Sequence, residues 1–317
     1  MSYQCKICDN ISDFKEYTVR EMQLGLRENF LYQYCNECDS LQISEFPGNL
    51  AKYYPDKDYY SFSSIATKNI LYSLYSTIVS KSSFNRKGIF FPLVKKFDLY
   101  DYSLLSIGKI NPPKHWRIAD IGSGAGQLLY MLQKFGYKNL TGIDPYVTKS
   151  EFPIEIKKIN ISELADEDIF DLIMFHHSFE HTADPVVTLL TAKKHISDDG
   201  IILIRTPLIS EAFKKYKEYW FQLDAPRHLH LQSLKSIKLM IERAGLKLLD
   251  IYCDSRDEQF YVSENYKNDI SIKEAKKTPL SSLFSVLFSE KRSKYRKEAR
   301  LLNQQMAGDT VVYYVTK

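Results

Sequence analysis

The sequence predicts an α/β fold with a largely parallel sheet, and three observations support this. Short apolar segments alternate with amphipathic helical segments through the central part of the chain, an order typical of a parallel sheet covered by helices. Residues 117–121, which we interpret as a buried strand, run directly into a glycine-rich turn, Gly122-Ser123-Gly124-Ala125-Gly126. A second short apolar run, residues 139–143, ends at the acidic residue Asp144.

The glycine turn predicts a ligand site at the end of the first core strand. Glycine tolerates positive φ and lets the main chain approach a ligand closely, while the first amides of the following helix face the ligand. Dinucleotide folds use the spacing G-x-G-x-x-G, whereas here Gly126 comes one residue early and Asp120 precedes the turn. This variant resembles the first motif of class I S-adenosylmethionine (SAM) methyltransferases.

Asp144 provides the matching acid at the next strand end. It follows Gly126 by 18 residues, with one amphipathic helix expected over residues 127–135 between them. A carboxylate at that position accepts ribose hydroxyls in nucleotide-binding folds, although a solvated loop acid is the alternative. We therefore expect SAM to contact this group of residues: Asp120, Gly122, Ser123, Gly124, Gln127, Asp144, Pro145 and His176.

The remaining elements follow from periodicity and from turn signals. Strands are expected over residues 154–159, 170–175, 200–205, 246–252 and 310–315, and helices over residues 184–196 and 233–244. Before the core, apolar residues at helical spacing predict helices over residues 65–80 and 90–105, which we interpret as a cover for the active-site mouth. Cys253 is expected to be a buried strand residue.

Length and charge favour one catalytic core with appendages. The 317 residues exceed one typical domain, and the net charge of +4 is too small to require a nucleic-acid or membrane partner. Nucleic acid is therefore an unlikely partner. We find no run of 18 apolar residues and no secretion signal, so the expected location is cytoplasmic.

Four cysteines predict a zinc-binding module in residues 1–45. They form two pairs with two residues between the members, Cys5 with Cys8 and Cys35 with Cys38, and together they offer four soft ligands for tetrahedral Zn²⁺. Two disulfides or free core thiols are the alternatives. Four protein ligands leave no open position, so the metal would be structural.

A tyrosine-rich segment and a long insertion are harder to interpret. The tyrosine-rich segment contains Tyr53, Tyr54, Tyr59 and Tyr60. Their flat rings and hydroxyls suit contact with a sugar or nucleotide as well as packing, and Tyr59 and Tyr60 are our candidates for substrate contact.

The insertion over residues 270–306 has an apolar stretch followed by a basic run. Its three possible roles are a helical lid, a dimer contact and a membrane-surface helix, and we favour the lid.

A histidine-rich segment follows the fourth core strand. Residues 175–181 carry three imidazoles and Glu180 at the carboxyl end of a central strand, where open α/β sheets bind ligands. A neutral histidine accepts a proton from a hydroxyl or from a carbon beside a ketone. We predict His181 and Glu180 as catalytic residues; the alternative is that both only order a loop or cap a helix.

Residues 220–230 form a second loop on the same rim. There His228 is a further candidate base. Arg227 suits a substrate phosphate through a forked hydrogen bond, and a structural ion pair is the equal alternative.

Taken together, these motifs resemble zinc-ribbon class I SAM methyltransferases, including those that modify nucleotide-linked sugars or surface polysaccharide precursors. The motifs that carry the resemblance are the cysteine pairs, the tyrosine-rich segment, the Asp120 glycine turn, Asp144, Phe179-Glu180-His181-x-x-Asp184-Pro185 and Asp224-x-Pro226-Arg227-His228-Leu229. The resemblance implies a Rossmann-like seven-stranded SAM methyltransferase core.

The expected domains are a zinc-binding module (1–45), a helical substrate cover (46–110), the SAM-binding core (111–269), a helical insertion (270–306) and the last core strand (307–317). The expected function is methylation of a sugar at oxygen or carbon, with SAM and Zn²⁺ as cofactors and a homodimer as a possible assembly. A zinc-containing ribosomal-RNA base methyltransferase and a non-catalytic binding protein are the alternatives.

Overall fold

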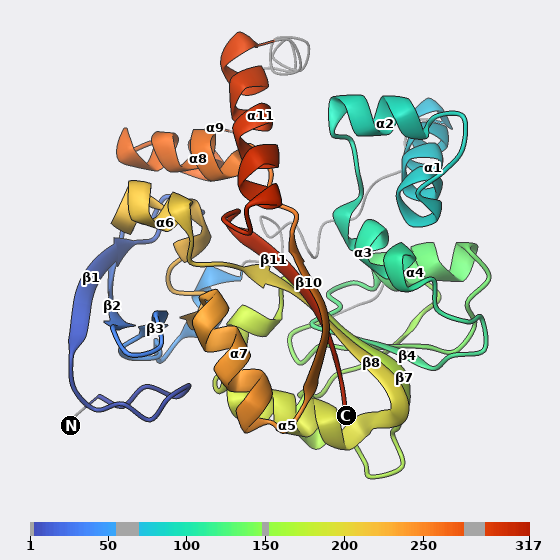
Figure 1. Cartoon of the computed structure of the whole chain (residues 1–317), viewed down its shortest axis with the longest axis horizontal. Coiled ribbons are helices and arrows are strands. Elements are labelled where there is room, and N and C mark those ends of the chain that lie inside the picture. Colours follow the sequence, from blue (N-terminus) through green and yellow to red (C-terminus); the bar gives the residue numbers. More distant parts are fainter. Residues whose placement is uncertain (1–2, 55–69, 148–151, 276–288) are drawn as a thin grey trace. The chain divides into compact units, whose positions relative to one another are not determined.

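The computed structural model describes residues 3–54, 70–147, 152–275 and 289–317 (Figure 1). The chain divides into two compact units. Unit 1 comprises Met1–Tyr54, His177–Leu190 and Ile204–Val315, and unit 2 comprises Pro55–His176, Thr191–Leu203 and Thr316–Lys317. Each unit is described by itself.

A seven-stranded sheet forms the core, in the order β10-β11-β8-β7-β4-β5-β6. Its strands are β4 (Ile118–Ile121), β5 (Leu140–Ile143), β6 (Glu155–Lys157), β7 (Phe170–His176), β8 (Ile196–Pro207), β10 (Lys247–Cys253) and β11 (Thr310–Thr316). Strand β4 pairs in parallel with β5 and β7, and β5 pairs in parallel with β6. The predicted α/β class with a largely parallel sheet is confirmed.

Strand β11 runs antiparallel to β8, as hydrogen bonds at its two ends show. The Leu208 N–H, just after β8, donates to the Asp309 carbonyl, just before β11. At the other end, the Thr316 hydroxyl donates to the Gly200 carbonyl. The sheet is thus mixed, with the parallel strands β4, β5, β6 and β7 on one side and the antiparallel pair β8 and β11 on the other.

The central strands are apolar because both faces of the sheet are covered. Every residue of β4 is buried, and β7 buries four consecutive residues, Leu172 to Phe175, as parallel strands do when helices pack on both faces. The helices of this part of the chain are α4 (Gln127–Lys134), α5 (Pro185–His195) and α7 (Leu234–Arg243). The Ser233 hydroxyl caps α7, and Gly245, with φ +59°, ends it as predicted.

Among the described residues of unit 2, three helices precede the core: α1 (Ile70–Asn85), α2 (Phe91–Phe97) and α3 (Tyr102–Ile110). The single helix predicted over residues 90–105 is wrong, because the chain turns at Asp98, with φ +57°, and restarts at Asp101. The Asp101 carboxylate accepts the Leu104 N–H at 3.1 Å and caps α3. Helices α1 and α3 cross closely at Gly108, where a Cβ atom would lie 1.9 Å from the Phe84 carbonyl oxygen.

The amino-terminal part of unit 1 forms a second, four-stranded antiparallel sheet, in the order β1-β2-β3-β9. Its strands are β1 (Phe14–Arg20), β2 (Asn29–Cys35), β3 (Ser40–Ile43) and β9 (His230–Leu231). Leu41 of β3 pairs with Leu231 of β9, so the loop after the fifth core strand completes this sheet. A cluster of buried aromatic and aliphatic side chains that includes Tyr32, Phe213 and Trp220 packs against it.

The other α-helices that the structure describes in unit 1 are α6 (Glu211–Tyr216), α8 (Glu258–Lys267), α9 (Ile272–Ala275) and α11 (Glu290–Gln304). Short 3₁₀ helices are η1 (Leu50–Tyr53), η2 (Ile161–Glu163), η3 (Phe179–His181), η4 (Lys217–Tyr219) and η5 (Phe221–Leu223), of which η2 belongs to unit 2. Within the described part of the chain, no helix combines the length and the apolar character needed to cross a membrane.

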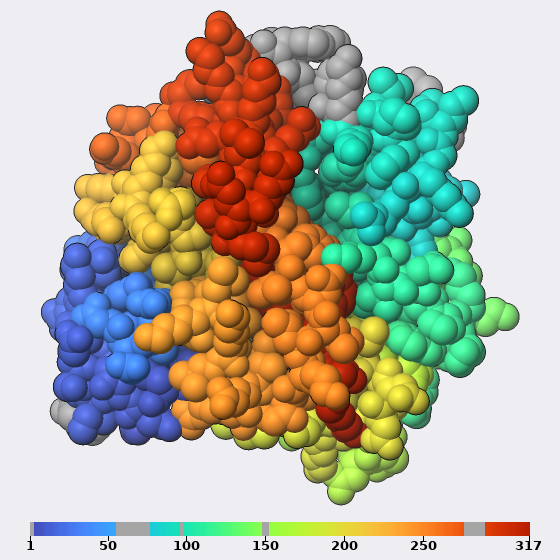
Figure 2. All heavy atoms as spheres, in the orientation of Figure 1, coloured from blue at the N-terminus to red at the C-terminus, as the bar shows by residue number. Residues whose placement is uncertain are grey.

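Helix α11 carries the basic run of the predicted insertion. Its side chains lie largely at the surface (Figure 2), and Ala299 is its buried residue. Arg292 forms an ion pair with Asp257, and Lys291 forms one with Glu264, so acidic neighbours in unit 1 neutralise part of the run. The apolar stretch expected within residues 280–288 lies outside the described residues, and the lid stays a prediction.

Candidate active site

The glycine turn has the backbone geometry that its sequence predicts. Asp120 is the third residue of β4, and Gly122, Gly124 and Gly126 then take φ angles of 73°, 53° and 86°. Residues with a Cβ rarely adopt this left-handed region. Helix α4 begins at once with Gln127, so its first amides lie beside the turn.

Asp144 joins the end of β5 to this turn. One carboxylate oxygen accepts the Gly124 N–H at 2.9 Å, and the other accepts the N–H groups of Tyr146 at 2.8 Å and Val147 at 3.1 Å. A carboxylate offers about four lone-pair positions. The described residues of unit 2 use three of them, which leaves one for a donor group of a ligand.

Asp120 is the second buried acid at the same edge of the sheet. Burial and, secondarily, the charge of Asp144 raise the pKa of Asp120 to about 8. A buried carboxyl group beside a glycine turn fits an ammonium group, because a cation there stabilises the ionised acid. The turn and the two acids thus fit a nucleoside that carries an amino acid.

The other predicted SAM residues surround this turn. The buried Ser123 hydroxyl has no hydrogen-bond partner among the described residues, and a Cβ on Gly142 would lie 2.6 Å from it. Gln127 is exposed, and Pro145 and His176 are half-buried. Contacts of these residues with SAM stay predictions.

A second cluster follows β7 directly, in unit 1. We call His177, Glu180, His181 and His228 the histidine cluster. The Glu180 side chain is fully buried and accepts bonds from the Thr206 hydroxyl at 3.0 Å and from His177 Nδ1 at 3.2 Å. Burial alone would raise the pKa of Glu180, but the His177 bond and the nearby imidazoles outweigh it and hold this pKa well below its usual range. Glu180 is therefore a carboxylate.

A buried chain of charges that the sequence analysis did not identify supports Glu180. Arg205, near the carboxyl end of β8, donates to His177 Nε2 and, through Nε, to Asp254 at 2.8 Å. Because His177 Nε2 accepts the hydrogen bond from Arg205, the ring proton lies on Nδ1, which donates a hydrogen bond to Glu180. Burial and the Arg205 charge lower the pKa of His177, so it stays neutral in this single tautomer.

His181 and His228 present the same arrangement as each other. His181 Nδ1 lies 2.8 Å from the Arg227 carbonyl, and His228 Nδ1 lies 2.6 Å from the Gln222 carbonyl. A carbonyl only accepts, so Nδ1 carries a proton in both rings. In a neutral imidazole Nε2 then holds a lone pair. Burial, followed by the neighbouring His228, lowers the pKa of His181 to about 4, which leaves it neutral and able to accept a proton at pH 7.

Arg227 lies in an internal ion pair, which is the alternative to phosphate binding. The side chain is fully buried, its Nε donates to Asp224 at 2.9 Å, and one terminal nitrogen donates to the Tyr53 carbonyl at 3.1 Å. Its guanidinium thus positions the loop that supplies His228. The predicted substrate residues Tyr59 and Tyr60 lie outside the described residues.

The four paired cysteines come together in unit 1. Cys5 and Cys38 have sulfur atoms 3.6 Å apart, and those of Cys8 and Cys35 are 3.5 Å apart. Disulfide sulfurs would be about 2.0 Å apart, whereas tetrahedral Zn–S bonds of about 2.3 Å separate ligands by about 3.8 Å. The geometry fits a structural zinc ion. Cys253 is buried at the end of β10, as expected for a strand residue.

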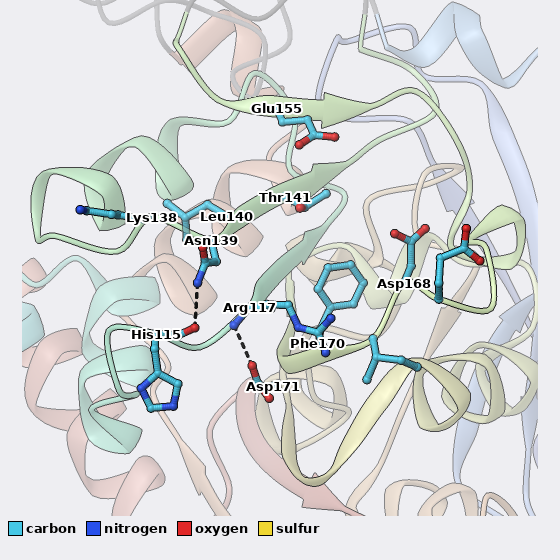
Figure 3. A pocket seen from close by; sticks show the side chains of 12 residues that line it. His115, Arg117, Lys138, Asn139, Leu140, Thr141, Glu155, Asp168, Phe170 and Asp171 are labelled. Carbon is cyan, nitrogen blue, oxygen red and sulfur yellow. Dashed lines mark hydrogen bonds between the residues drawn. The ribbon is translucent and has the colours of Figure 1, made fainter.

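A pocket of about 590 Å³ lies at the opposite edge of the unit 2 strands (Figure 3). Arg117, Asn139 and Phe170 line it at or next to the amino ends of β4, β5 and β7. The Arg117 N–H bonds the Asp171 carboxylate there, and the Asn139 amide bonds the His115 carbonyl. Ligands of open α/β sheets bind at the carboxyl ends, so we assign the chemistry to the glycine turn and not to this pocket.

The middle of the chain matches a known protein family. Residues 95–251, which include the glycine turn, Asp144 and the whole histidine cluster, match a family model described as a methyltransferase domain. A tRNA U34 carboxymethyltransferase of Aeromonas salmonicida is 23% identical over 175 residues, covering 47% of this chain and 51% of that protein. One of Campylobacter jejuni is 23% identical over 157 residues, covering 45% and 53%. The chain thus spans about half the length of these curated relatives.

Solved structures resemble the chain only distantly. Coclaurine N-methyltransferase is 16% identical with a TM-score of 0.42, and the comparison covers 74% of this chain and 73% of that one. A SAM-dependent methyltransferase from Archaeoglobus fulgidus is 17% identical with a TM-score of 0.44, covering 73% and 100%.

Proposed function

Since residues 95–251 match a methyltransferase domain and the core has the class I fold, we propose that this protein transfers a methyl group from SAM to a sugar acceptor. The observation that carries the proposal is the bond of 2.9 Å from the Gly124 N–H to Asp144, which shapes the glycine turn inside the matched domain. The methyl donor would lie against this turn. Its ribose would meet Asp144, and its ammonium group would meet Asp120.

SAM supplies a methyl group already activated on a positively charged sulfur. The protein's own task is then to hold the acceptor in line with that methyl and to remove its proton. The acceptor oxygen or carbon forms a bond to the methyl carbon as the carbon–sulfur bond breaks, and the acceptor proton leaves for a base.

His181 is our candidate for that base. Its ring is neutral, its Nδ1–H is held by the Arg227 carbonyl, and its Nε2 lone pair is available. Glu180 stabilises the imidazolium that forms, because the carboxylate of this neighbouring residue is buried and ionised. The chain connects the cluster to the end of β7, the strand that pairs with β4 in parallel.

The acceptor class follows from the motif resemblance, which favours a nucleotide-linked sugar or a polysaccharide precursor. RNA is the second candidate, because the curated relatives are named for a transfer to tRNA U34. The modest net charge of +4 supports the sugar. Incubation with methyl-labelled SAM and either nucleotide-sugars or tRNA separates the two, and label in tRNA alone would contradict the sugar.

The same proposal includes the zinc ion on the four cysteines as a structural cofactor and a cytoplasmic location. A non-catalytic binding role is the remaining alternative. Failure of the protein to bind SAM would favour that role.

A further inference from the structure

We propose that Glu180, His181 and His228 form a binding site for a divalent first-row metal ion, distinct from the four cysteines. One potential ligand atom of each of these three residues lies within 4.8 Å of the other two. All three residues belong to unit 1. The site itself does not depend on the proposed methyl transfer.

The first argument is that each potential ligand already has the outer partner that metal ligands use. The Nδ1–H groups of His181 and His228 are held by the backbone carbonyls of Arg227 and Gln222. Glu180 accepts from Thr206 and His177. Metal-bound histidines characteristically donate their second ring N–H to such an acceptor, and ligating carboxylates are hydrogen-bonded in turn.

The second argument is that two carboxylates converge on one ring nitrogen. His228 Nε2 lies 3.8 Å from Glu180 Oε1 and 3.7 Å from Asp224 Oδ2, and its side chain is 8% exposed. Carboxylates that approach each other in a largely buried place favour a cation between them, and a metal ion on Nε2 would supply that charge.

The chemistry of the donor set indicates the class of ion. Two imidazole nitrogens and one carboxylate form the facial set that binds Fe²⁺, and the same donors suit Mn²⁺ and Zn²⁺. Asp224 is neutralised by Arg227 and serves as the outer partner of this set. Three protein ligands leave coordination positions open.

An open coordination position on the ion has a consequence for methyl transfer, and this part of the inference rests on the proposed function. An acceptor hydroxyl bound to the ion would lose its proton more easily, because a metal ion lowers the pKa of a bound hydroxyl. In the loaded protein the ion would replace His181 as the group that activates the acceptor, because His181 would be a ligand, and the hydroxyl proton would pass to solvent. A chelator that removes this ion would then lower activity, whereas it would not if His181 acts as the base.

Mn²⁺ is the appropriate probe, because it prefers oxygen and nitrogen ligands and the zinc-loaded cysteines do not compete for it. The experiment titrates the zinc-loaded full chain with Mn²⁺, in the absence of SAM, and follows free Mn²⁺ by electron paramagnetic resonance. We expect one bound Mn²⁺ per chain, and at least a tenfold weaker affinity in Glu180→Gln and in His228→Gln.

His115→Ala is the matched control, because it removes an exposed imidazole of unit 2 and should leave binding unchanged. Circular dichroism checks that each variant folds. The proposal is overturned if the wild type binds no Mn²⁺, or if Glu180→Gln and His228→Gln both bind it as tightly as the wild type. Loss of methyl transfer alone would leave this result intact.

Discussion

The backbone N–H of Gly124 donates a hydrogen bond of 2.9 Å to the carboxylate of Asp144, a residue 20 positions later in the chain. The bond joins the turn after β4 to the end of the neighbouring strand β5. The same carboxylate also fixes the backbone amides of Tyr146 and Val147. One acidic side chain thus holds both walls of the proposed SAM site.

Asp144→Asn should therefore weaken SAM binding. The amide keeps one acceptor oxygen but loses the charge, and charge-assisted bonds contribute about 1.5–3 kcal/mol each, so we expect an affinity about ten to a hundred times lower by calorimetry. Asp171→Asn is the control, because Asp171 accepts the Arg117 N–H at 2.8 Å at the other edge of the same strands. Equal affinity in Asp144→Asn and wild type would contradict the ribose assignment.

Affinity for S-adenosylhomocysteine, which keeps the amino-acid ammonium group, should rise with pH between about 6 and 8. Burial and Asp144 raise the pKa of Asp120 to about 8, so below that pH the free protein holds a proton that the ligand's cation displaces. The rise approaches tenfold per pH unit and levels off above pH 8.

Asp120→Asn should remove this pH dependence, and calorimetry at several pH values measures it. The same substitution also tests how the free energy of unfolding depends on pH. Because the pKa of Asp120 is raised in the folded chain, its contribution to stability is present at low pH and is lost as the pH rises through about 8. A pH profile of binding that is identical in the variant would exclude Asp120 from the ammonium site.

His181→Ala should lower the turnover number by about a hundredfold or more, the range of a lost proton acceptor. SAM affinity should change little, because the glycine turn and Asp144 are untouched. Steady-state kinetics and calorimetry on one preparation measure both quantities. His115→Ala serves as the control. Unchanged turnover in His181→Ala would remove this residue from the mechanism.

Cys5→Ser and Cys38→Ser should each abolish stoichiometric zinc and lower the unfolding temperature. Their sulfur atoms are 3.6 Å apart, and Zn²⁺ needs all four thiolates to close the site. Elemental analysis and thermal unfolding test this. Cys253→Ser, at the end of β10 and outside the cluster, should keep its zinc, and zinc retained by the two cluster variants would contradict the assignment.

The parallel core could be predicted because its signals are local. Residues 117–126 contain an apolar strand and its turn together, and Asp144 ends the next apolar run. The break between α2 and α3 also had a local signal, since Asp98 and Asp101 disfavour helix continuation and favour a cap. Apolar periodicity concealed it.

Other features depend on contacts between distant parts of the chain. Arg205 reaches Asp254, which lies 49 residues later, and no local pattern indicates that pairing. Strand β9, His230–Leu231, joins a sheet whose other three strands lie before residue 44, so nearly 190 residues separate it from β3. The ion pair of Arg227 could be anticipated from the sequence, because Asp224 lies three residues earlier and this spacing favours a local pair.

Transfer of label from methyl-labelled SAM to a panel of nucleotide-sugars and tRNA tests the central claim most directly. The account predicts label in a nucleotide-sugar, dependent on Asp144 and His181. An absence of label in every acceptor, together with a failure to bind SAM, would contradict it.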